Sequence, residues 1–357
     1  MRIGYLIDTQ RRGAPGPRAV AVADSIDAMV EEGILAERAG FHAVLAPDRH
    51  RSSECHLPGP EQLLTLLAHE TTRVALGSFT FVATLVHPMK AAEQFSVIDN
   101  LSRGRLFTTL SRGFLSAYWG QFGIPEHKLL GRFRETVEIW RHAFAGERLD
   151  FAGEHWQVRG GRLDPPPFQP GGWPLWGGGN ASPAAAARSA EYAESWTADP
   201  LPTSDEAWEE RAGAYRERAR ALGRRPFVAL MRDGWVADSF EEAARTFGEH
   251  FLPAARFYLR TGQLAGHPDF TREEDLTLER LAPHLVLGTP AQCVERLEWL
   301  HEERGVDEVV LCCRIAGGPS AEETREQILR LGEEVVRPIH ARYPAPDHPA
   351  VPAACRW

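Results

Sequence analysis

A chain of 357 residues, 43% hydrophobic and 25% charged, is long enough for one α/β barrel of about 250 residues with insertions. Its formal net charge of −9 argues against a nucleic-acid partner, because a phosphate backbone requires a basic surface. No apolar run approaches the roughly 20 residues that span a bilayer, and the first predicted strand begins at Met1. We therefore expect a cytoplasmic protein without a signal peptide. The five cysteines lack metal-ligand spacing, so we expect reduced thiols and no metal site.

Strand and helix patterns alternate along most of the chain. Short apolar runs predict strands, and apolar residues at helical spacing predict helices. The predicted strands cover residues 1–8, 43–46, 74–85, 106–110, 174–176, 195–198, 227–236 and 308–314. The predicted helices cover 20–39, 60–70, 88–101, 129–144, a stretch from about 182, 204–222, 290–304 and 320–341. Eight strand–helix units in one domain favour a (β/α)₈ TIM barrel over an open sheet.

Three segments lie outside this alternation. Residues 149–152 and 155–158 alternate apolar and polar side chains, which predicts a β-hairpin inserted before the fifth strand. Residues 239–285 predict a long helical insertion after the seventh strand, and its polar middle is typical of a functional loop or a lid. We expect residues 1–343 to form a single barrel domain and the proline-rich tail, residues 344–357, to be loosely ordered.

One ordered run of motifs surrounds the third and fourth strands. It comprises Gly77-Ser78, His87-Pro88 at the start of a helix, Ala92-Glu93, Asp99, and Ser102-Arg103-Gly104-Arg105 before the strand at 106–110. This run resembles the bacterial-luciferase-like family of flavin-dependent oxidoreductases, whose members are (β/α)₈ barrels. The resemblance covers roughly the whole chain and is weakest from about 251 to 283.

Ser111, Arg112 and Gly113 follow the fourth strand, and barrel enzymes place their chemistry in the loops after strands. The planar guanidinium of Arg112 suits bidentate binding of a phosphate, and the alternative is a salt bridge to a neighbouring carboxylate. The resemblance implies that Arg112 binds the phosphate of flavin mononucleotide (FMN) and that Ser111 lies beside the reactive face of the flavin. It also matches Phe79-Thr80 to a position where this family often has a non-proline cis peptide bond.

A second candidate for the phosphate site is the loop Gly177-Gly178-Gly179-Asn180-Ala181-Ser182 between a strand and a helix. Its glycines allow the backbone to approach an anion, and the helix N-terminus offers free N–H groups. The alternative is a flexible turn in which Ser182 is the helix N-cap, and the two interpretations are compatible. The resemblance implies that Gly177, Gly178, Gly179, Asn180 and Ser182 bind the cofactor. Luciferases carry Glu-Ser where this chain has Gly178-Gly179, so those contacts would come from the backbone.

Asp48, Arg49 and His50 follow the second strand. Histidine exchanges a proton near neutral pH, although a single loop histidine is more often a surface residue. The resemblance matches Asp48 to an acidic position and His50 to the second of two histidines. Arg49 occupies the position of the histidine with the catalytic role in luciferases. Either His50 carries the proton transfer, which we favour, or Arg49 orients an anionic group of the substrate.

Other residues have open roles. Tyr118, Trp119, Trp176 and Trp235 are candidates for the wall of an apolar substrate pocket, with ordinary core packing as the alternative. Asp8, Arg232 and Arg314 lie in or near strands one, seven and eight and are candidates for the barrel mouth.

The resemblance implies a flavin-dependent monooxygenase that uses reduced FMN and O₂ to oxygenate a small organic substrate. No GxGxxG dinucleotide pattern follows the first strand, so a separate flavin reductase would supply the reduced FMN. One alternative is a deazaflavin (coenzyme F420)-dependent oxidoreductase of the same barrel family, and another is a non-catalytic flavin-binding accessory subunit. Members of the family are commonly dimers or tetramers, so a homo-oligomer is expected.

Overall fold

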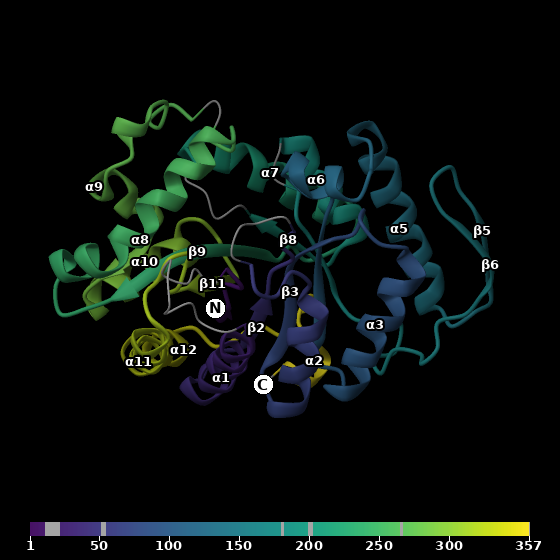
Figure 1. Ribbon diagram of the computed structural model, residues 1–357, viewed down its shortest axis with the longest axis horizontal. Helices are drawn as coiled ribbons and strands as arrows, with labels where there is room; N and C mark the ends of the chain where they lie inside the picture. Colours follow the sequence, from purple (N-terminus) through teal and green to yellow (C-terminus); the bar gives the residue numbers. More distant parts are fainter. Residues whose placement is uncertain (11–21, 51–54, 180–181, 199–202, 265–266, 357) are drawn as a thin grey trace.

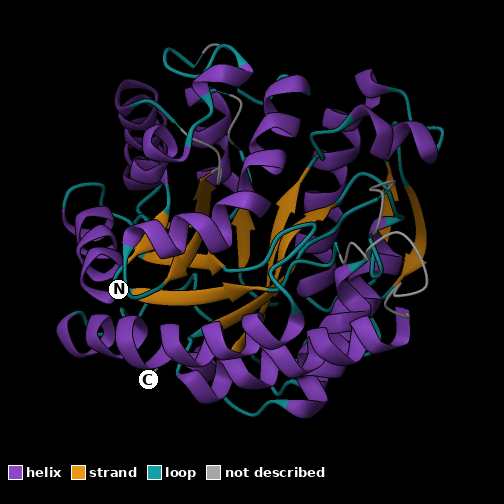
Figure 2. Cartoon of the chain, turned by 60° about the vertical axis from the view of Figure 1, so that its left-hand side comes forward, coloured by secondary structure: helices purple, strands orange, loops and turns teal. Residues whose placement is uncertain are grey.

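The computed structural model describes residues 1–10, 22–50, 55–179, 182–198, 203–264 and 267–356. In the described residues, eight parallel strands close into a barrel surrounded by helices (Figures 1 and 2). The barrel strands are β1 (Arg2–Leu6), β2 (Ala43–Ala46), β3 (Ala75–Val82), β4 (Leu106–Ser111), β7 (Leu175–Gly177), β8 (Ser195–Ala198), β9 (Val228–Val236) and β11 (Glu308–Cys312). Their hydrogen-bonded order is β9-β11-β1-β2-β3-β4-β7-β8, and the β8–β9 pairing completes the ring. The predicted (β/α)₈ barrel is confirmed.

The helices lie between the strands in sequence and cover the outside of the barrel (Figure 2). They are α1 (Val22–Ala39), α2 (Pro60–Glu70), α3 (Pro88–Leu101), α4 (Ser116–Gln121), α5 (Leu129–Phe144), α6 (Pro183–Tyr192), α7 (Asp205–Ala221), α8 (Phe240–Arg260), α9 (Leu278–Leu281), α10 (Pro290–Glu302), α11 (Ala321–Leu331) and α12 (Arg337–Arg342). Several start at a serine or threonine whose side chain accepts from a backbone N–H of the first turn, as at Ser204, Ser239 and Thr289. The elements β2, β8, α2, α3 and α5 have the predicted bounds.

Both predicted insertions are present. The strands β5 (Leu149–Ala152) and β6 (Gln157–Gly161) form an antiparallel hairpin at the edge of the molecule (Figure 1). The segment after β9 is helical and contains α8 and α9. It ends in a strand that the sequence did not predict, β10 (Val286–Gly288), which pairs with the last residues of β9. The predicted helix at 320–341 is divided into α11 and α12 by a π-helical segment, Gly332–Val336.

The core has two parts because successive residues of a strand point to opposite faces. Leu6, Leu45, Phe107 and Met231 belong to a cluster inside the barrel. Their neighbours along the strands pack outward against the helices in a larger cluster, which includes Tyr5, Val44, Leu106 and Leu230. Among the described helices, none has both the length and the apolar character needed to cross a membrane.

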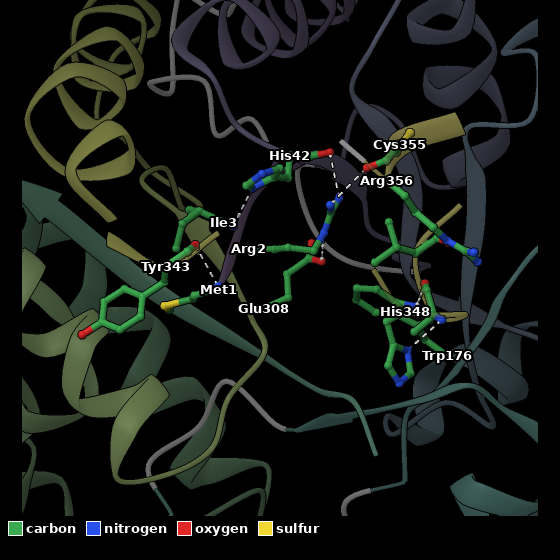
Figure 3. A network of polar contacts seen from close by, with 12 residues as sticks. Met1, Arg2, Ile3, His42, Trp176, Glu308, Tyr343, His348, Cys355 and Arg356 are labelled. Atoms are coloured by element: carbon green, nitrogen blue, oxygen red, sulfur yellow. Dashed lines mark hydrogen bonds and ion pairs between the residues drawn. The ribbon is translucent and has the colours of Figure 1, made fainter. Parts of the chain in front are cut away.

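The tail closes the barrel at the amino-terminal ends of the strands. Ala350, Val351 and Cys355 are buried and belong to the interior cluster. Trp176 of β7 donates from its indole nitrogen to the carbonyl of Ala350 at 2.8 Å (Figure 3). His348 bonds the carbonyl of Arg225 at 2.9 Å. The expectation of a loosely ordered tail is therefore wrong for residues 344–356, because these contacts fix the tail against the barrel.

A buried ion pair lies at the same end (Figure 3). Arg2 Nε and Glu308 Oε2 are 2.9 Å apart, and both side chains are 1% exposed. Arg2 also donates to the carbonyls of Cys355 and His42, both at 3.3 Å. The first strand, the last strand and the tail are thus joined through one guanidinium.

Candidate active site

The predicted site residues gather at the carboxyl-terminal ends of the strands, opposite the tail. Asp8 follows β1, residues 48–50 follow β2, and Phe79-Thr80 lies within β3. Ser111 is the last residue of β4, and Gly177 is the last residue of β7. Asn180 lies outside the described residues. This end of a barrel is where (β/α)₈ enzymes carry their active sites.

Thr80, Ser111 and Gly178 meet at one point of the barrel mouth. The hydroxyl of Thr80 donates to the hydroxyl of Ser111 at 2.8 Å. The Gly178 N–H donates to the carbonyl of Leu110 at 3.0 Å, and a Cβ at Gly178 would lie 3.4 Å from Thr80 Cγ2 and 3.5 Å from Ser111 Cβ. The Phe79-Thr80 peptide bond is cis, as the resemblance implied. Three residues predicted separately thus form one surface.

The backbone of the glycine loop is packed too closely to accept side chains. A Cβ at Gly179 would lie 2.5 Å from the carbonyl oxygen of Ala185, so a larger residue does not fit. Trp196 of β8 donates from its indole nitrogen to the carbonyl of Gly179 at 2.9 Å. Ser182 accepts from the Ala185 N–H at 3.2 Å and caps α6, as the second interpretation of this loop predicted. The fixed backbone and the capped helix start are compatible with an anion at this point.

Arg112 is exposed beside the end of β4. Its carbonyl accepts from the hydroxyl of Thr84 at 3.1 Å, which fixes its backbone. Within the part of the chain that the structure describes, no carboxylate forms an ion pair with the Arg112 guanidinium. The alternative role as a salt-bridge partner is therefore not found there, and the guanidinium is accessible to an anion from solvent.

Asp48 and His50 form a pair. His50 Nε2 and Asp48 Oδ1 are 2.7 Å apart, and the second carboxylate oxygen accepts from the Val82 N–H at 2.9 Å. Burial alone would lower the pKa of His50, but the hydrogen bond and the negative charge of Asp48 outweigh it and raise the pKa above its usual value. The rings of Tyr118 and Phe122 meet the imidazole edge-on, at centroid distances of 6.1 and 5.1 Å. The imidazole is thus oriented by a carboxylate and sheltered by two aromatic rings.

Arg49 is held by a different set of partners. Its Nη1 donates to Gln10 Oε1 at 2.8 Å, its Nε lies 3.8 Å from Asp8 Oδ1, and it is hydrogen-bonded to Tyr258 of α8. Burial opposes its charge, yet Asp8 and Tyr258 raise the pKa of Arg49 above its usual value. The charge of Arg49 is therefore balanced within the protein, which leaves it less suited than Arg112 to bind an external anion.

Sequence reasoning missed three polar residues at this end. Asp233 is the last residue of β9 that pairs with β11, and it follows Ala229 and Met231 on the inner face. Burial and the charge of Asp8 raise the pKa of Asp233 to about 7, and one of its carboxylate oxygens is buried without a hydrogen-bond partner in the described part of the chain. Glu61 of α2 faces the Asp48–His50 pair, and burial together with the charge of Asp48 raises its pKa. Tyr258 is the third.

Three candidates lie elsewhere. Arg232 faces outward from β9, since it alternates with the inward Asp233 and lines a cavity outside the barrel. Trp176 packs on Phe107 inside the barrel and bonds the tail, and Trp235 stacks on Phe247 in the outer core. The proposal that Trp176 and Trp235 form a substrate wall is therefore wrong, whereas Tyr118 does lie beside His50. Among the described residues, no group of three or more His, Cys, Asp or Glu side chains is arranged to hold a metal ion.

Together, the closed parallel barrel and the polar side chains at its strand ends define an enzyme of the (β/α)₈ class. The family model described as luciferase-like monooxygenase matches residues 1–308. This chain belongs to the luciferase-like monooxygenase family, and the predicted membership is confirmed.

Individual relatives agree with this assignment. The chain is 26% identical over 330 residues to the oxygenase component of the flavin-dependent trigonelline monooxygenase of Acinetobacter baylyi, which covers 87% of this chain and 89% of that protein. Its fold resembles the monooxygenase RslO1 of Streptomyces bottropensis, with a TM-score of 0.82 and 22% identity over 94% of this chain and 99% of the other. It also resembles the oxygenating constituent of 3,6-diketocamphane monooxygenase of Pseudomonas putida, solved with FMN, with a TM-score of 0.78 and 18% identity over 94% and 98%.

Proposed function

We propose that this chain is the oxygenase component of a two-component monooxygenase that uses reduced FMN and O₂ to oxygenate a small organic substrate. The observation that supports it best is the exposed Arg112 guanidinium, without a carboxylate partner in the described chain, one residue after Ser111, which lies beside Gly178. An exposed cation at the same barrel end as a glycine loop and a helix N-terminus suits a phosphate. Family membership adds the expectation of a flavin at this end of the barrel.

The residues present fit FMN. Arg112, Gly177, Gly178, Gly179 and Ser182 would hold its phosphate; Phe79, Thr80 and Ser111 would lie along its ring, because they form the adjoining surface of the mouth. Asn180 keeps its predicted role in the phosphate loop. Bound reduced FMN would supply the oxygen-activating chemistry. The protein would bind, orient and shelter the reactants.

His50 would hold and move a proton. Asp48 engages Nε2, which orients the ring, so Nδ1 would be the nitrogen that exchanges a proton with a reactant. Asp48 is itself fixed by the backbone of β3, so the imidazole keeps one orientation. Arg49 is tied to Asp8 and Tyr258, and its role is to organise this cluster. A non-catalytic accessory subunit would not need the oriented Asp48–His50 pair, which favours an enzyme.

A titration with FMN and with coenzyme F420, each oxidised and reduced, tests the proposal. Tighter binding of reduced FMN, together with O₂ consumption only when a flavin reductase and NADH are added, would support it. Tighter binding of the deazaflavin would favour the F420-dependent alternative. Rapid NADH oxidation by the pure protein would contradict the need for a reductase partner. Sedimentation of the same sample tests the expected homo-oligomer.

The phosphate contact is tested by Arg112→Ala. A charge-assisted hydrogen bond contributes about 1.5–3 kcal/mol, so we expect FMN binding to weaken by roughly 10- to 100-fold. Riboflavin has the same ring without the phosphate, and its affinity should hardly change. Arg134→Ala, at an exposed arginine of α5, is the matched control. Equal losses for FMN and riboflavin would mean that Arg112 acts through the fold.

A further inference from the structure

A second site is indicated by a cavity of about 200 Å³ on the outside of the barrel. It lies over the outer face of β9, where Leu230 and Arg232 alternate with inward-facing residues. Trp208 of α7 forms one wall, and Arg296 and Trp299 of α10 form the other. The cavity is therefore separate from the barrel mouth that contains Arg112 and His50.

The lining of this cavity is strongly basic. It includes Arg232, Arg296 and Arg304, and of the described lining residues only Asp205 carries a carboxylate. Asp205 is 87% exposed and pairs with Arg304, which also binds Glu209 Oε1 at 3.0 Å. These carboxylates thus balance Arg304 at the solvent edge. The overall charge of −9 makes such a basic pocket unusual for this chain.

Two hydrogen-bond donors in the lining have no partner among the residues that the structure describes. The indole nitrogen of Trp208 is buried and meets no acceptor in that part of the chain, and Trp208 as a whole is only 5% exposed. Arg296 Nε is likewise buried without an acceptor, while another nitrogen of the same guanidinium donates to the carbonyl of Pro283. Nearly all buried donors in native proteins are paired. Two unpaired donors on one small basic cavity point to an acceptor-rich ligand.

Trp299 fixes the position of the Arg296 guanidinium, and among the described residues no carboxylate forms an ion pair with it. It lies over the ring of Trp299, 4.1 Å from the centroid, and Arg304 lies over the same ring at 4.7 Å. Burial and the charge of Arg304 lower the pKa of Arg296 to about 10. Burial and the charge of Arg232 lower the pKa of His284 to about 4, so this imidazole is neutral at pH 7 and available for hydrogen bonding.

We propose that this cavity binds a small oxyanion of the phosphate class, held by Arg296 and the indole N–H of Trp208. An oxyanion supplies acceptors for both unpaired donors and negative charge for the arginine cluster. The volume is below the roughly 300 Å³ at which pockets for drug-sized ligands begin, so a free phosphate or a small phosphate monoester fits better than a flavin. This site does not depend on the proposed function.

The test is calorimetric titration with inorganic phosphate and with glycerol 3-phosphate, made in the Arg112→Ala background so that binding at the proposed flavin phosphate site is weakened. Adding Arg296→Gln should weaken binding by about 10- to 100-fold, and adding Trp208→Phe, which keeps a ring but removes the donor, by about 3- to 10-fold. Arg342→Gln is the matched control. Like Arg296, that arginine lies over an aromatic ring, but it is exposed and, unlike Arg296, pairs with the carboxylate of Glu298.

Each outcome bears on the proposal. Binding that survives Arg112→Ala and is lost in Arg296→Gln and Trp208→Phe, but not in Arg342→Gln, supports it. The tighter of the two probes then identifies a free ion or an organic phosphate as the ligand class. Binding abolished by Arg112→Ala alone, binding insensitive to Arg296→Gln and Trp208→Phe, or no binding of either probe overturns it. If Arg296→Gln lowers the melting temperature, Trp208→Phe alone decides.

Discussion

Glu308→Gln tests how the barrel is closed at its base. The substitution keeps the size of the side chain but removes the negative charge that lies 2.9 Å from Arg2. Because both residues are 1% exposed, the guanidinium of Arg2 would remain buried without a counter-charge. Breaking a buried ion pair from one side costs about 3–5 kcal/mol. Burial raises the pKa of Glu308 even though Arg2 opposes that shift, which shows how strongly this site disfavours an isolated charge.

The expected change in melting temperature follows from the size of the chain. At about 2.1 cal/mol/K of unfolding entropy per residue, 357 residues correspond to roughly 0.75 kcal/mol/K. A loss of about 3–5 kcal/mol therefore lowers the melting temperature by roughly 4–7 °C, measurable by scanning calorimetry. Arg2→Met alone also removes the donor that the carbonyls of His42 and Cys355 share. The double variant should cost about 1–3 kcal/mol less than the sum of the single variants.

Glu298→Gln provides the control, because Glu298 pairs with Arg342 at the surface. Exposed pairs contribute about 0–1 kcal/mol, so this variant should shift the melting temperature by about 1 °C or less. If Glu308→Gln behaved like Glu298→Gln and the two single effects simply added, the buried pair would not be what joins β1, β11 and the tail.

Three further predictions concern His50 and His348. His50→Ala should slow turnover by about 100-fold and leave FMN binding unchanged in the same preparation, whereas unchanged turnover would move the proton transfer to Arg49 or another group. Asp48→Asn should lower the pKa of His50, so the part of the pH–rate profile that His50 controls moves to lower pH; an unmoved profile would mean that His50 does not control it. Burial lowers the pKa of His348 to about 4, so the unfolded chain binds a proton there more readily than the folded one. The contribution of neutral His348 to the free energy of unfolding is complete above about pH 6.5. This contribution declines by roughly 3 kcal/mol as the pH falls to 4. His348→Gln should flatten the dependence of unfolding free energy on pH in that window, and identical slopes would exclude this role.

Elements with strong local signals were predictable from the sequence. The helix Pro60–Glu70 starts at a proline and carries apolar residues at helical spacing, so its bounds follow from neighbouring residues alone. The strand Val286–Gly288 escaped prediction because three residues form no period and its existence depends on pairing with β9. The ordered packing of the tail was not predicted for a related reason. Its proline-rich composition contains no information about Trp176, whose indole bonds Ala350.

In the candidate site, too, residues with a local sequence signal were predictable and residues placed by distant contacts were not. The family pattern identified Thr80, Ser111 and Arg112, and the structure brings Thr80 and Ser111 into contact. The sequence did not show that Asp233, rather than Arg232, faces the inside of the barrel. The direction of each of two adjacent strand residues depends on the register with the neighbouring strands. Tyr258 belongs to the segment where the resemblance is weakest, and only the packing of α8 against the mouth brings it to Arg49.

The join between the two ends of the chain has a consequence for synthesis. Arg2 and Glu308 are separated by 306 positions, and β1 pairs with β11 along its length. At about 5–20 residues per second, roughly 15–60 s pass between the emergence of β1 and that of β11 from a ribosome. Throughout that interval β1 has one unpaired edge, and an unpaired edge is a template for association with other chains. Slower expression at low temperature, or added chaperone, should therefore raise the yield of correctly closed barrels more than it raises total protein.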